Sequence, residues 1–203
     1  MSPPRVSKRL LIQQRQELAL YRRLLPSLDL KRRQLVVELA KERNAMEAWE
    51  HQLGEIDAAA RSQLPMLAET ELPLDGLVEV ESVTYKTVNI MGVRLPVLDE
   101  VVTHTKPYGL LTRPAWVDVL VLLMERAIRV ALSLSVARVR VARLAASVRR
   151  MSQRVNLFER VLIPRAIDNI RQARIVLGDL ERAAVVRAKL AKARARQVGV
   201  GTT

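Results

Sequence analysis

The sequence predicts a mainly α-helical protein, in which two very long antiparallel helices form a coiled coil and a small β-hairpin cap is inserted between them. Two apolar seams with alternating steps of three and four residues predict the helices. A stretch with a period of two lies between the seams and predicts the hairpin. We expect the first helix in residues 1–67, the cap in 68–113, the second helix in 114–198 and a flexible tail in 199–203.

The first seam extends from Leu11 to Leu67, and nearly all of its positions are apolar. A spacing of 3.5 residues held over about eight heptads keeps one stripe of a helix facing a partner helix. The seam therefore predicts a coiled-coil helix. Its positions are Leu11, Gln14, Leu18, Tyr21, Leu25, Leu28, Arg32, Leu35, Leu39, Glu42, Met46, Trp49, Leu53, Ile56, Ala60, Gln63 and Leu67.

One proline interrupts the first helix. Pro26 has no amide proton and its ring clashes with the preceding turn, so we expect a bend or a break between Leu24 and Ser27. The seam passes through this point unchanged, with Leu25 and Leu28 both on it, so we expect the partner helix to stay in contact.

The middle of the chain changes to a period of two. Helix-breaking residues precede it, and Met91-Gly92 can form a tight turn in which Gly92 supplies a positive φ. Pro96 fits only an edge position, because it has no backbone donor. These features predict two strands. The helix-ending residues are Pro65, Pro73, Asp75 and Gly76, and the alternating apolar residues are Val78, Val80, Val83, Tyr85, Val88, Ile90, Val93, Leu95 and Val97.

The second helix is expected to begin at Thr112–Pro114, with Asp118 near the positive end of its macrodipole. Unbroken, it would be on the order of 120 Å long. Pro164 is its only strong interruption, and the seam changes phase there. The seam positions are Leu120, Met124, Ala127, Ala131 and Leu134, then Val141, Leu144, Val148, Met151, Val155, Phe158 and Leu162, then Ala166, Ile170, Ala173, Leu177, Leu180 and Ala184.

An antiparallel pairing of the two seams predicts facing residues whose numbers add up to about 183. Leu28 then lies near Val155, and Leu39 near Leu144. The same register places the acidic stretch from Glu38 to Asp57 beside the basic stretch from Arg126 to Arg143. Charge therefore favours this register over one displaced by a heptad.

The composition gives little sign of catalysis. The chain has 203 residues, a net charge of +13 and no cysteine, and it contains 27 arginines against 7 lysines. Its two histidines, His51 and His104, lie on different predicted elements without a second ligand at metal-binding spacing. Phosphate loops, nucleophile elbows and paired-carboxylate signatures are missing from the sequence. We therefore expect a protein that is not an enzyme and that needs no cofactor and no metal.

Membrane insertion is not expected. The longest apolar run, residues 117–124, is broken by Asp118 and falls far short of the roughly 20 residues that span a bilayer. The start of the chain lacks the apolar core and cleavage site of a signal peptide. These observations predict a soluble protein.

Three stretches carry a resemblance to a known family. They are the basic first helix from Arg9 to Leu35, the sequence Asn-Ile-Met-Gly-Val-Arg-Leu-Pro at 89–96, and Val-Asn-Leu-Phe-Glu-Arg-Val-Leu-Ile-Pro-Arg at 155–165. With these stretches the chain resembles the D subunits of V/A-type (vacuolar/archaeal-type) rotary ATPases, a family that forms their central rotor shaft. The resemblance covers nearly the whole chain.

The resemblance implies a cytoplasmic protein that is peripheral to the membrane as part of a membrane-bound complex. Its implied partners are the catalytic and non-catalytic nucleotide-binding subunits of a hexamer, a smaller central-stalk subunit and a membrane-rotor adaptor subunit. It also implies partner-binding roles for an arginine-rich helix face and for the hairpin. These residues are Arg149, Arg150, Arg154, Arg160, Pro164, Arg165, Arg171 and Arg174 on the helix, and Asn89, Ile90, Met91, Gly92, Val93 and Pro96 on the hairpin.

Two other classes share part of the pattern. A prefoldin-like coiled-coil chaperone also places strands between two helices, but it needs exposed apolar tips, whereas this chain ends in Arg194, Arg196 and a polar tail. A nucleic-acid-binding coiled coil would use the arginines on phosphates. The basic stretch has almost no interleaved aromatic residues, so we expect no nucleic-acid partner.

Overall fold

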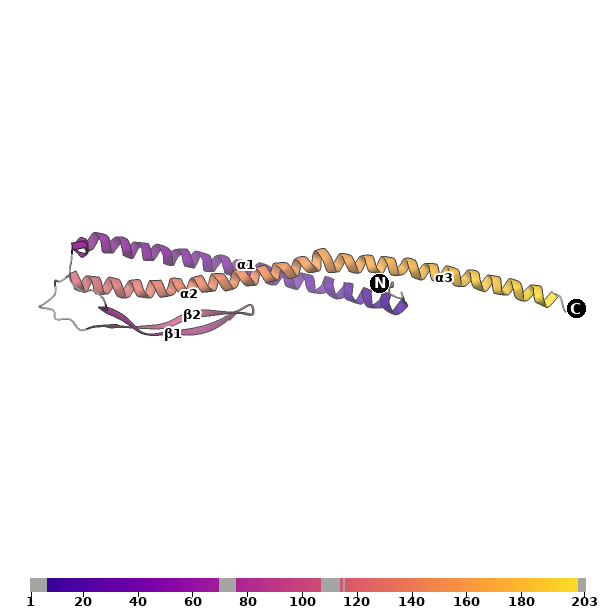
Figure 1. The fold of residues 1–203 in the computed structure, drawn as a ribbon, viewed down its shortest axis with the longest axis horizontal. Coiled ribbons are helices and arrows are strands. Elements are labelled where there is room, and N and C mark those ends of the chain that lie inside the picture. The colour runs from indigo at the N-terminus through magenta and orange to yellow at the C-terminus, as the bar shows by residue number, and fades with distance from the viewer. Residues whose placement is uncertain (1–6, 70–75, 107–113, 115, 201–203) are drawn as a thin grey trace. The chain divides into compact units, whose positions relative to one another are not determined.

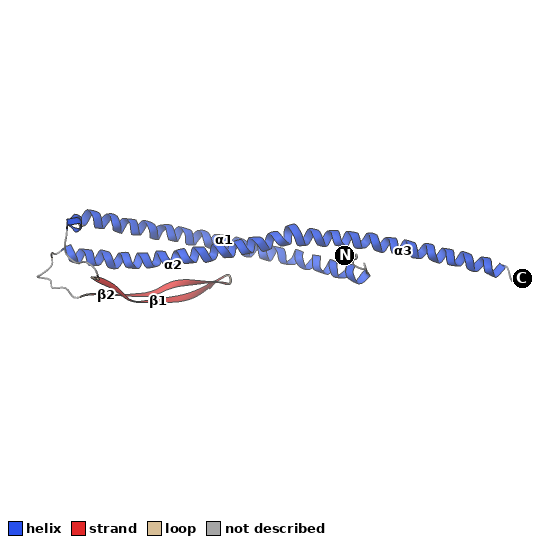
Figure 2. Ribbon diagram, viewed as in Figure 1, coloured by secondary structure: helices blue, strands red, loops and turns tan. Residues whose placement is uncertain are grey.

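The computed structural model describes residues 7–69, 76–106, 114 and 116–200. Figure 1 and Figure 2 show that helices make up most of them and that the strands form a single hairpin. The predicted fold class is confirmed. In chain order the elements are α1 (Lys8–Gln63), the 3₁₀ turn η1 (Pro65–Glu69), β1 (Val78–Ile90), β2 (Val93–Thr105), α2 (Trp116–Leu157), the π-helical turn η2 (Phe158–Leu162) and α3 (Ile163–Val200).

The chain divides into two compact units, and each contains a part of both long helical segments. One unit joins residues 1–30 with residues 151–203, so the start of α1 belongs with η2 and α3. The other unit is formed by residues 31–150, which contain the rest of α1, both strands and most of α2. We call them the terminal unit and the hairpin unit.

The predicted seam of α1 matches the residues that the structure protects from solvent. Every seam position from Leu11 to Ala60 is buried or half-buried, and Gln63 is exposed. The polar seam residues Gln14, Arg32 and Glu42 are half-buried as well. A period of 3.5 therefore identified the protected stripe even where the residue type argued against burial.

Pro26 does not break α1, so of the two expected outcomes, a bend or a break, the break is wrong. The helix continues through Leu24–Ser27. The Ser27 hydroxyl donates a hydrogen bond of 2.8 Å to the Leu24 carbonyl. Leu25 and Leu28 are half-buried on either side of the proline, so burial of the seam continues across it. This packing offsets the cost of one missing helical hydrogen bond at an exposed site.

Pro164 also lies inside continuous helix, and the π-helical turn η2 explains the change of seam phase beside it. The Ile163 amide donates to the carbonyl of Phe158, five residues back. A π-helical turn accommodates one extra residue. The seam needs this extra residue because it advances by four residues three times in succession, from Phe158 to Leu162, to Ala166 and to Ile170.

Three seam positions of the second helix are exposed, contrary to prediction: Ala131, Leu180 and Ala184. At Ala131 the buried neighbour is Val130, one position earlier. In the terminal unit, Lys8 at the start of α1 forms an ion pair of 3.2 Å with Glu181. The part of α3 beyond this level, which includes Ala184, extends past the first residue of α1, so no described residue of α1 lies beside it.

The ends of the predicted segments differ from those of the elements. α1 ends at Gln63, and the remaining seam residue Leu67 belongs to η1. The helix restart is seen at Pro114, whose carbonyl accepts a hydrogen bond of 3.0 Å from Val117. Asp118 lies in the first turn of α2, as predicted. Pro73, Asp75, Thr112, Arg113 and residues 201–203 lie outside the described residues, and α3 extends to Val200.

The hairpin agrees with the predicted turn. β1 and β2 pair in antiparallel register from Val78 with Thr105 to Ile90 with Val93. Met91 (φ 54°) and Gly92 (φ 88°) connect them, and the Gly92 amide donates to the Asn89 side-chain oxygen at 2.9 Å. Positive φ at both residues is the geometry of a type I′ turn, which matches the twist of the strands. A methionine in this conformation is unusual.

Two irregularities interrupt the pairing of the hairpin, and the first explains the change of phase between Val80 and Val83 in the apolar alternation. The pairing shifts between Val80 and Ser82, which leaves Glu81 as an extra residue in β1. It shifts again between Thr84 and Tyr85, which leaves Asp99 as an extra residue in β2. Each bulge moves the following side chains to the other face of the strand.

The hairpin does more than cover one end of the helices. At its base, Leu77 and Val78 join the buried cluster of Leu64, Val117 and Leu120. Nearer its tip, the Arg140 and Arg143 guanidinium groups of α2 donate to the carbonyl groups of Pro96 and Arg94, at 3.3 and 3.0 Å. Within the hairpin unit, β2 therefore lies along α2 for much of its length, as Figure 1 shows.

The predicted register of the helices leads to a crosslinking test. The contacts between Glu42 and Arg140 and between Gln14 and Asn169 match that register, whereas the contact between the Tyr21 and Phe158 rings departs from it by four residues. Because the chain has no cysteine, Leu39→Cys/Leu144→Cys introduces a single pair within the hairpin unit. We expect an intramolecular disulfide to form readily on oxidation, because both side chains are buried on facing seams. Gel mobility before and after reduction measures it.

Leu39→Cys/Val119→Cys is the matched control for this test, because Val119 is an exposed residue of α2. It should form no intramolecular bond. Preferential crosslinking of Leu39 with a position one heptad from Leu144 would reject the register.

Candidate interaction surfaces

The described part of the chain holds no group of three or more His, Asp or Glu side chains that could bind a metal ion. On α1, 3.3 Å separates His51 Nδ1 from Glu55 Oε1. His104 is paired with Glu79 in the register of the hairpin, so the two histidines lie on different elements. None of the helices within the described ranges combines the length and the apolar character needed to cross a bilayer.

One carboxylate of the hairpin has a perturbed pKa. The Lys106 ammonium group donates a hydrogen bond of 2.6 Å to Glu79, and this bond, together with the positive charge of Lys106, lowers the pKa of Glu79. Both side chains are more than half exposed. The pair therefore ties the base of β1 to the residue that follows β2 and gives no sign of acid–base chemistry.

Charge is divided unequally between the two units. The terminal unit carries 17 basic and 6 acidic side chains, a net charge of +11. The hairpin unit carries 17 basic and 15 acidic side chains, a net charge of +2. Almost the whole excess of the chain therefore belongs to residues 1–30 and 151–203.

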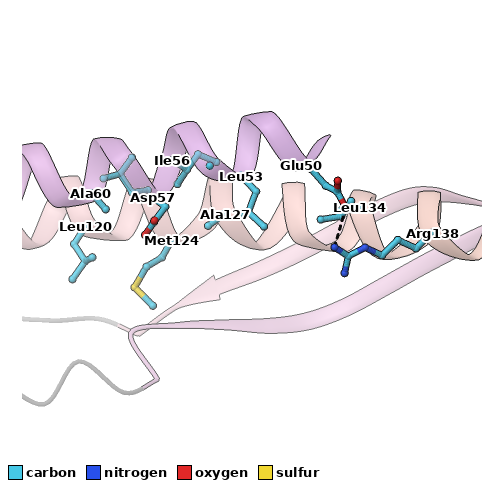
Figure 3. A pocket seen from close by; sticks show the side chains of 12 residues that line it. Glu50, Leu53, Ile56, Asp57, Ala60, Leu120, Met124, Ala127, Leu134 and Arg138 are labelled. Atoms are coloured by element: carbon cyan, nitrogen blue, oxygen red, sulfur yellow. Dashed lines mark hydrogen bonds and ion pairs between the residues drawn. The ribbon is translucent and has the colours of Figure 1, made fainter. Parts of the chain in front are cut away.

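In the hairpin unit, α1 supplies carboxylates to the arginines of α2. Arg138 pairs with Glu50 at 3.0 Å, and Figure 3 shows this pair at the rim of an apolar groove. Arg140 forms a two-pronged ion pair with Glu42, with 2.8 Å between Nε and Oε2. The predicted match of the acidic stretch with the basic stretch is confirmed at these two points.

The apolar groove of the hairpin unit has a volume of about 590 Å³ and lies between α1 and α2. Figure 3 shows Leu53, Ile56 and Met124 among the side chains that line it. Small residues leave this space: Ala60 and Ala127 line the groove, and a Cβ added at Gly54 would meet no atom within 4 Å. The seam residues that line the groove were predicted to make apolar contacts, but the groove itself was not predicted.

In the terminal unit, four arginines surround a groove of about 560 Å³. Arg15 and Arg22 come from α1, and Arg171 and Arg174 come from α3. All four are exposed, and none forms an ion pair with a carboxylate of the described residues. We call this site the arginine groove. The other residues that line it are Leu18, Ala19, Ile167, Ile170 and Ile175.

The arginine groove joins two predicted site residues, Arg171 and Arg174, with two that the sequence analysis missed. The missed residues, Arg15 and Arg22, are seven apart and flank the seam residue Leu18, so they lie on one side of α1. That spacing was the available signal. An apolar floor with cationic rims suits an acidic surface that also carries apolar side chains.

The other predicted arginines lie on exposed helix. Arg149, Arg154, Arg160 and Arg165 are exposed, as is Pro164. Arg150 is exposed too, but its guanidinium group donates a hydrogen bond of 2.9 Å to Ser147, a buried polar residue. Arg150 therefore has a structural contact of its own, whereas the others lack ion pairs among the described residues.

The predicted hairpin residues divide into a turn and a contact with α2. Met91 and Gly92 form the exposed turn, and the Asn89 side chain holds it closed. Ile90 and Val93, which are half-buried, form the last strand pair. Pro96 differs from the others because its carbonyl accepts a hydrogen bond from Arg140.

Comparison with known proteins identifies the family. The family model for the D subunit of ATP synthase matches residues 10–193. The chain belongs to this ATP synthase family. It is 34% identical over 192 residues to the V-type ATP synthase D subunit of Borreliella burgdorferi, with 95% of each chain covered. It is 32% identical over 178 residues to the protein of the same name from Chlamydia felis, with 85% of this chain and 84% of the relative covered.

Membership of this family confirms the resemblance that the sequence motifs indicated. The matched residues contain the terminal unit's arginine groove and the whole hairpin. The family assignment therefore applies to both surfaces described above.

Proposed function

We propose that the chain is the non-catalytic rotor shaft, or central-stalk subunit, of a V/A-type proton- or sodium-translocating ATPase or ATP synthase. The shaft transmits torque between a hexamer of catalytic and non-catalytic nucleotide-binding subunits and the membrane rotor. The observation that carries this proposal is the division of charge. The terminal unit has a net charge of +11, and the four arginines of its groove form no ion pair with the described residues, whereas the hairpin unit is nearly balanced.

The terminal unit is the part that contacts the hexamer. The arginine groove supplies cations around an apolar floor, and Arg154, Arg160 and Arg165 add exposed cations on the same unit. Exposed ion pairs contribute roughly 0–1 kcal/mol each, so single contacts exchange easily. Many weak contacts guide a turning shaft without locking it at one angle.

The hairpin unit is the part that contacts the rest of the rotor. Two of its arginines are engaged internally with Glu42 and Glu50, which leaves the hairpin turn as the distinctive exposed feature. The smaller central-stalk subunit binds at this turn. An adaptor subunit links the hairpin unit to the membrane rotor, so the chain itself stays peripheral to the membrane on the cytoplasmic side.

Reconstitution tests the proposed function. The full chain is added to a hexamer of nucleotide-binding subunits from a V/A-type ATPase, and binding and ATP turnover are measured. We expect stoichiometric binding and a changed rate of ATP hydrolysis. Binding of the chain to duplex DNA is measured in parallel at several salt concentrations, since the affinity of a protein for nucleic-acid phosphates depends steeply on salt. Binding to DNA with a steep dependence on salt, without binding to the hexamer, would contradict the proposed function as a rotor shaft.

The hairpin turn offers a test of the stalk contact. Met91→Asn should lower affinity for the smaller stalk subunit by about tenfold to a hundredfold, since a buried methionine contributes about 1.5–3 kcal/mol. Asparagine tolerates the positive φ at this position, so the turn should persist. Titration calorimetry measures the affinity.

Val36→Asn is the matched control for this test, because Val36 on α1 and Met91 are both 47% exposed. It should leave the affinity unchanged. Equal affinities for the two variants would place the stalk contact elsewhere.

A further inference from the structure

Arg140 of α2 contacts two other elements at once. From α2, its guanidinium group forms the two-pronged ion pair with Glu42 of α1 and donates from Nη1 to the Pro96 carbonyl of β2 at 3.3 Å. The Arg140 and Glu42 side chains are only 17% and 15% exposed.

The position of Pro96 explains why an arginine suits this junction. Pro96 pairs with Thr87, and its carbonyl points away from β1 towards α2. Since proline has no amide proton, the edge of β2 presents an acceptor but no donor at this residue. A guanidinium group has only donors, in a planar fork that can bind a carboxylate and still reach a second acceptor.

The apolar packing at the same junction is incomplete. A groove of about 260 Å³ opens between the hairpin and the helices, and Arg140 and Glu42 are among its lining residues. The strand residues Val97 and Leu98 line it together with Trp49 of α1. Where side chains leave such a space, dispersion contacts hold the elements together less firmly. Directional hydrogen bonds then have more influence on where the strand lies.

A second arginine repeats the contact one turn along. Arg143 donates to the Arg94 carbonyl at 3.0 Å, two residues from Pro96 on the same edge of β2. Arg143 is exposed and has no carboxylate partner in the described residues, so its side chain is held less firmly. Of the two arginines, Arg140 is held more firmly, because Glu42 orients its guanidinium group.

We propose that Arg140 is a positioning residue that joins the hairpin to the helix pair and fixes where the hairpin turn is held. Glu42 orients the guanidinium group, and the guanidinium group holds β2 through the Pro96 carbonyl. The inference rests on the proposed function only for its consequence, which is that the turn meets the smaller stalk subunit in one fixed position. The joining itself concerns this chain alone.

Arg140→Lys is the decisive variant. A lysine keeps a positive charge beside Glu42, but its compact ammonium group cannot reproduce the two-pronged pair together with the carbonyl contact. Spin labels at Thr87→Cys on β1 and Val139→Cys on α2 report the position of the hairpin, since both sites are exposed and the chain has no other cysteine. We expect a narrow distance distribution with Arg140 and a broad one with lysine, at an unchanged melting temperature.

Two further variants complete the design. Arg129→Lys makes the same change at an exposed arginine of α2 and should keep the distribution narrow. Arg140→Leu/Glu42→Leu replaces the ion pair with apolar side chains, and such replacements are often tolerated in folded proteins. It should stay folded and still show a broad distribution, because the Pro96 contact is missing.

Affinity for the smaller stalk subunit separates this inference from the proposed function. We expect Arg140→Lys to weaken binding about tenfold and Arg129→Lys to leave it unchanged. A narrow distribution in Arg140→Lys overturns the positioning role, whatever the affinity. A broad distribution with unchanged affinity supports the positioning role and contradicts the stalk contact at the hairpin turn.

Discussion

Leu144→Ala is expected to lower the free energy of unfolding by about 2–5 kcal/mol, the range for large-to-small changes in well-packed cores. Leu144 is 0% exposed and lies on α2 in the hairpin unit. A long helix pair has a thin core, so few neighbours can move in to fill the cavity that the substitution leaves. Urea denaturation followed by circular dichroism measures the change.

Leu122→Ala is the matched control for the core substitution. Leu122 lies on the same helix, but it is 66% exposed. Its replacement should change the free energy of unfolding by no more than about 0.5 kcal/mol. A loss below about 1 kcal/mol at Leu144, or equal losses at the two positions, would contradict the assignment of Leu144 to the core.

The helices were predictable because their packing repeats. Each seam position tests the same rule, so one wrong residue such as Gln63 does little harm to the prediction as a whole. The changes of phase were visible too. The change of seam phase beside Pro164 corresponds to the π-helical turn η2, and the break in strand alternation between Val80 and Val83 corresponds to the bulge at Glu81.

The place of the hairpin was not predictable in the same way. It depends on single contacts between residues far apart in the chain, such as Arg140 with Pro96 and Arg143 with Arg94. No periodic pattern in the sequence predicts these contacts. A break at Pro26 was expected as one possibility and did not occur for a related reason, because continued burial of Leu25 and Leu28 overrides a local preference.

The prediction of the interaction site was incomplete because each helix was considered on its own. Charge counting indicated a basic second helix, but it did not separate arginines that α1 neutralises, such as Arg138 and Arg140, from those without a carboxylate partner in the described residues. It also missed Arg15 and Arg22, since their proximity to Arg171 depends on how α1 and α3 pair in the terminal unit. The distinction between paired and unpaired arginines needed the structure.

Replacing the four residues of the arginine groove with glutamine is expected to weaken binding to the hexamer by about one to three orders of magnitude at low salt. Each exposed pair contributes roughly 0–1 kcal/mol, and a factor of ten corresponds to about 1.4 kcal/mol. The fold should persist, because Arg15, Arg22, Arg171 and Arg174 are exposed and have no internal ion pairs in the described residues. Surface plasmon resonance against the immobilised hexamer measures the affinity.

The control for the arginine groove removes the same number of charges from exposed residues of the hairpin unit, namely Lys31, Arg43, Arg126 and Arg129. If the effect depended only on net charge, both quadruple variants would lose affinity equally. If the arginine groove is the contact, only its own variant loses affinity, and the loss shrinks as salt shortens the Debye length from ~30 Å at 0.01 M to ~8 Å at 0.15 M. Unchanged binding of the groove variant at low salt rejects the assignment of the terminal unit to the hexamer.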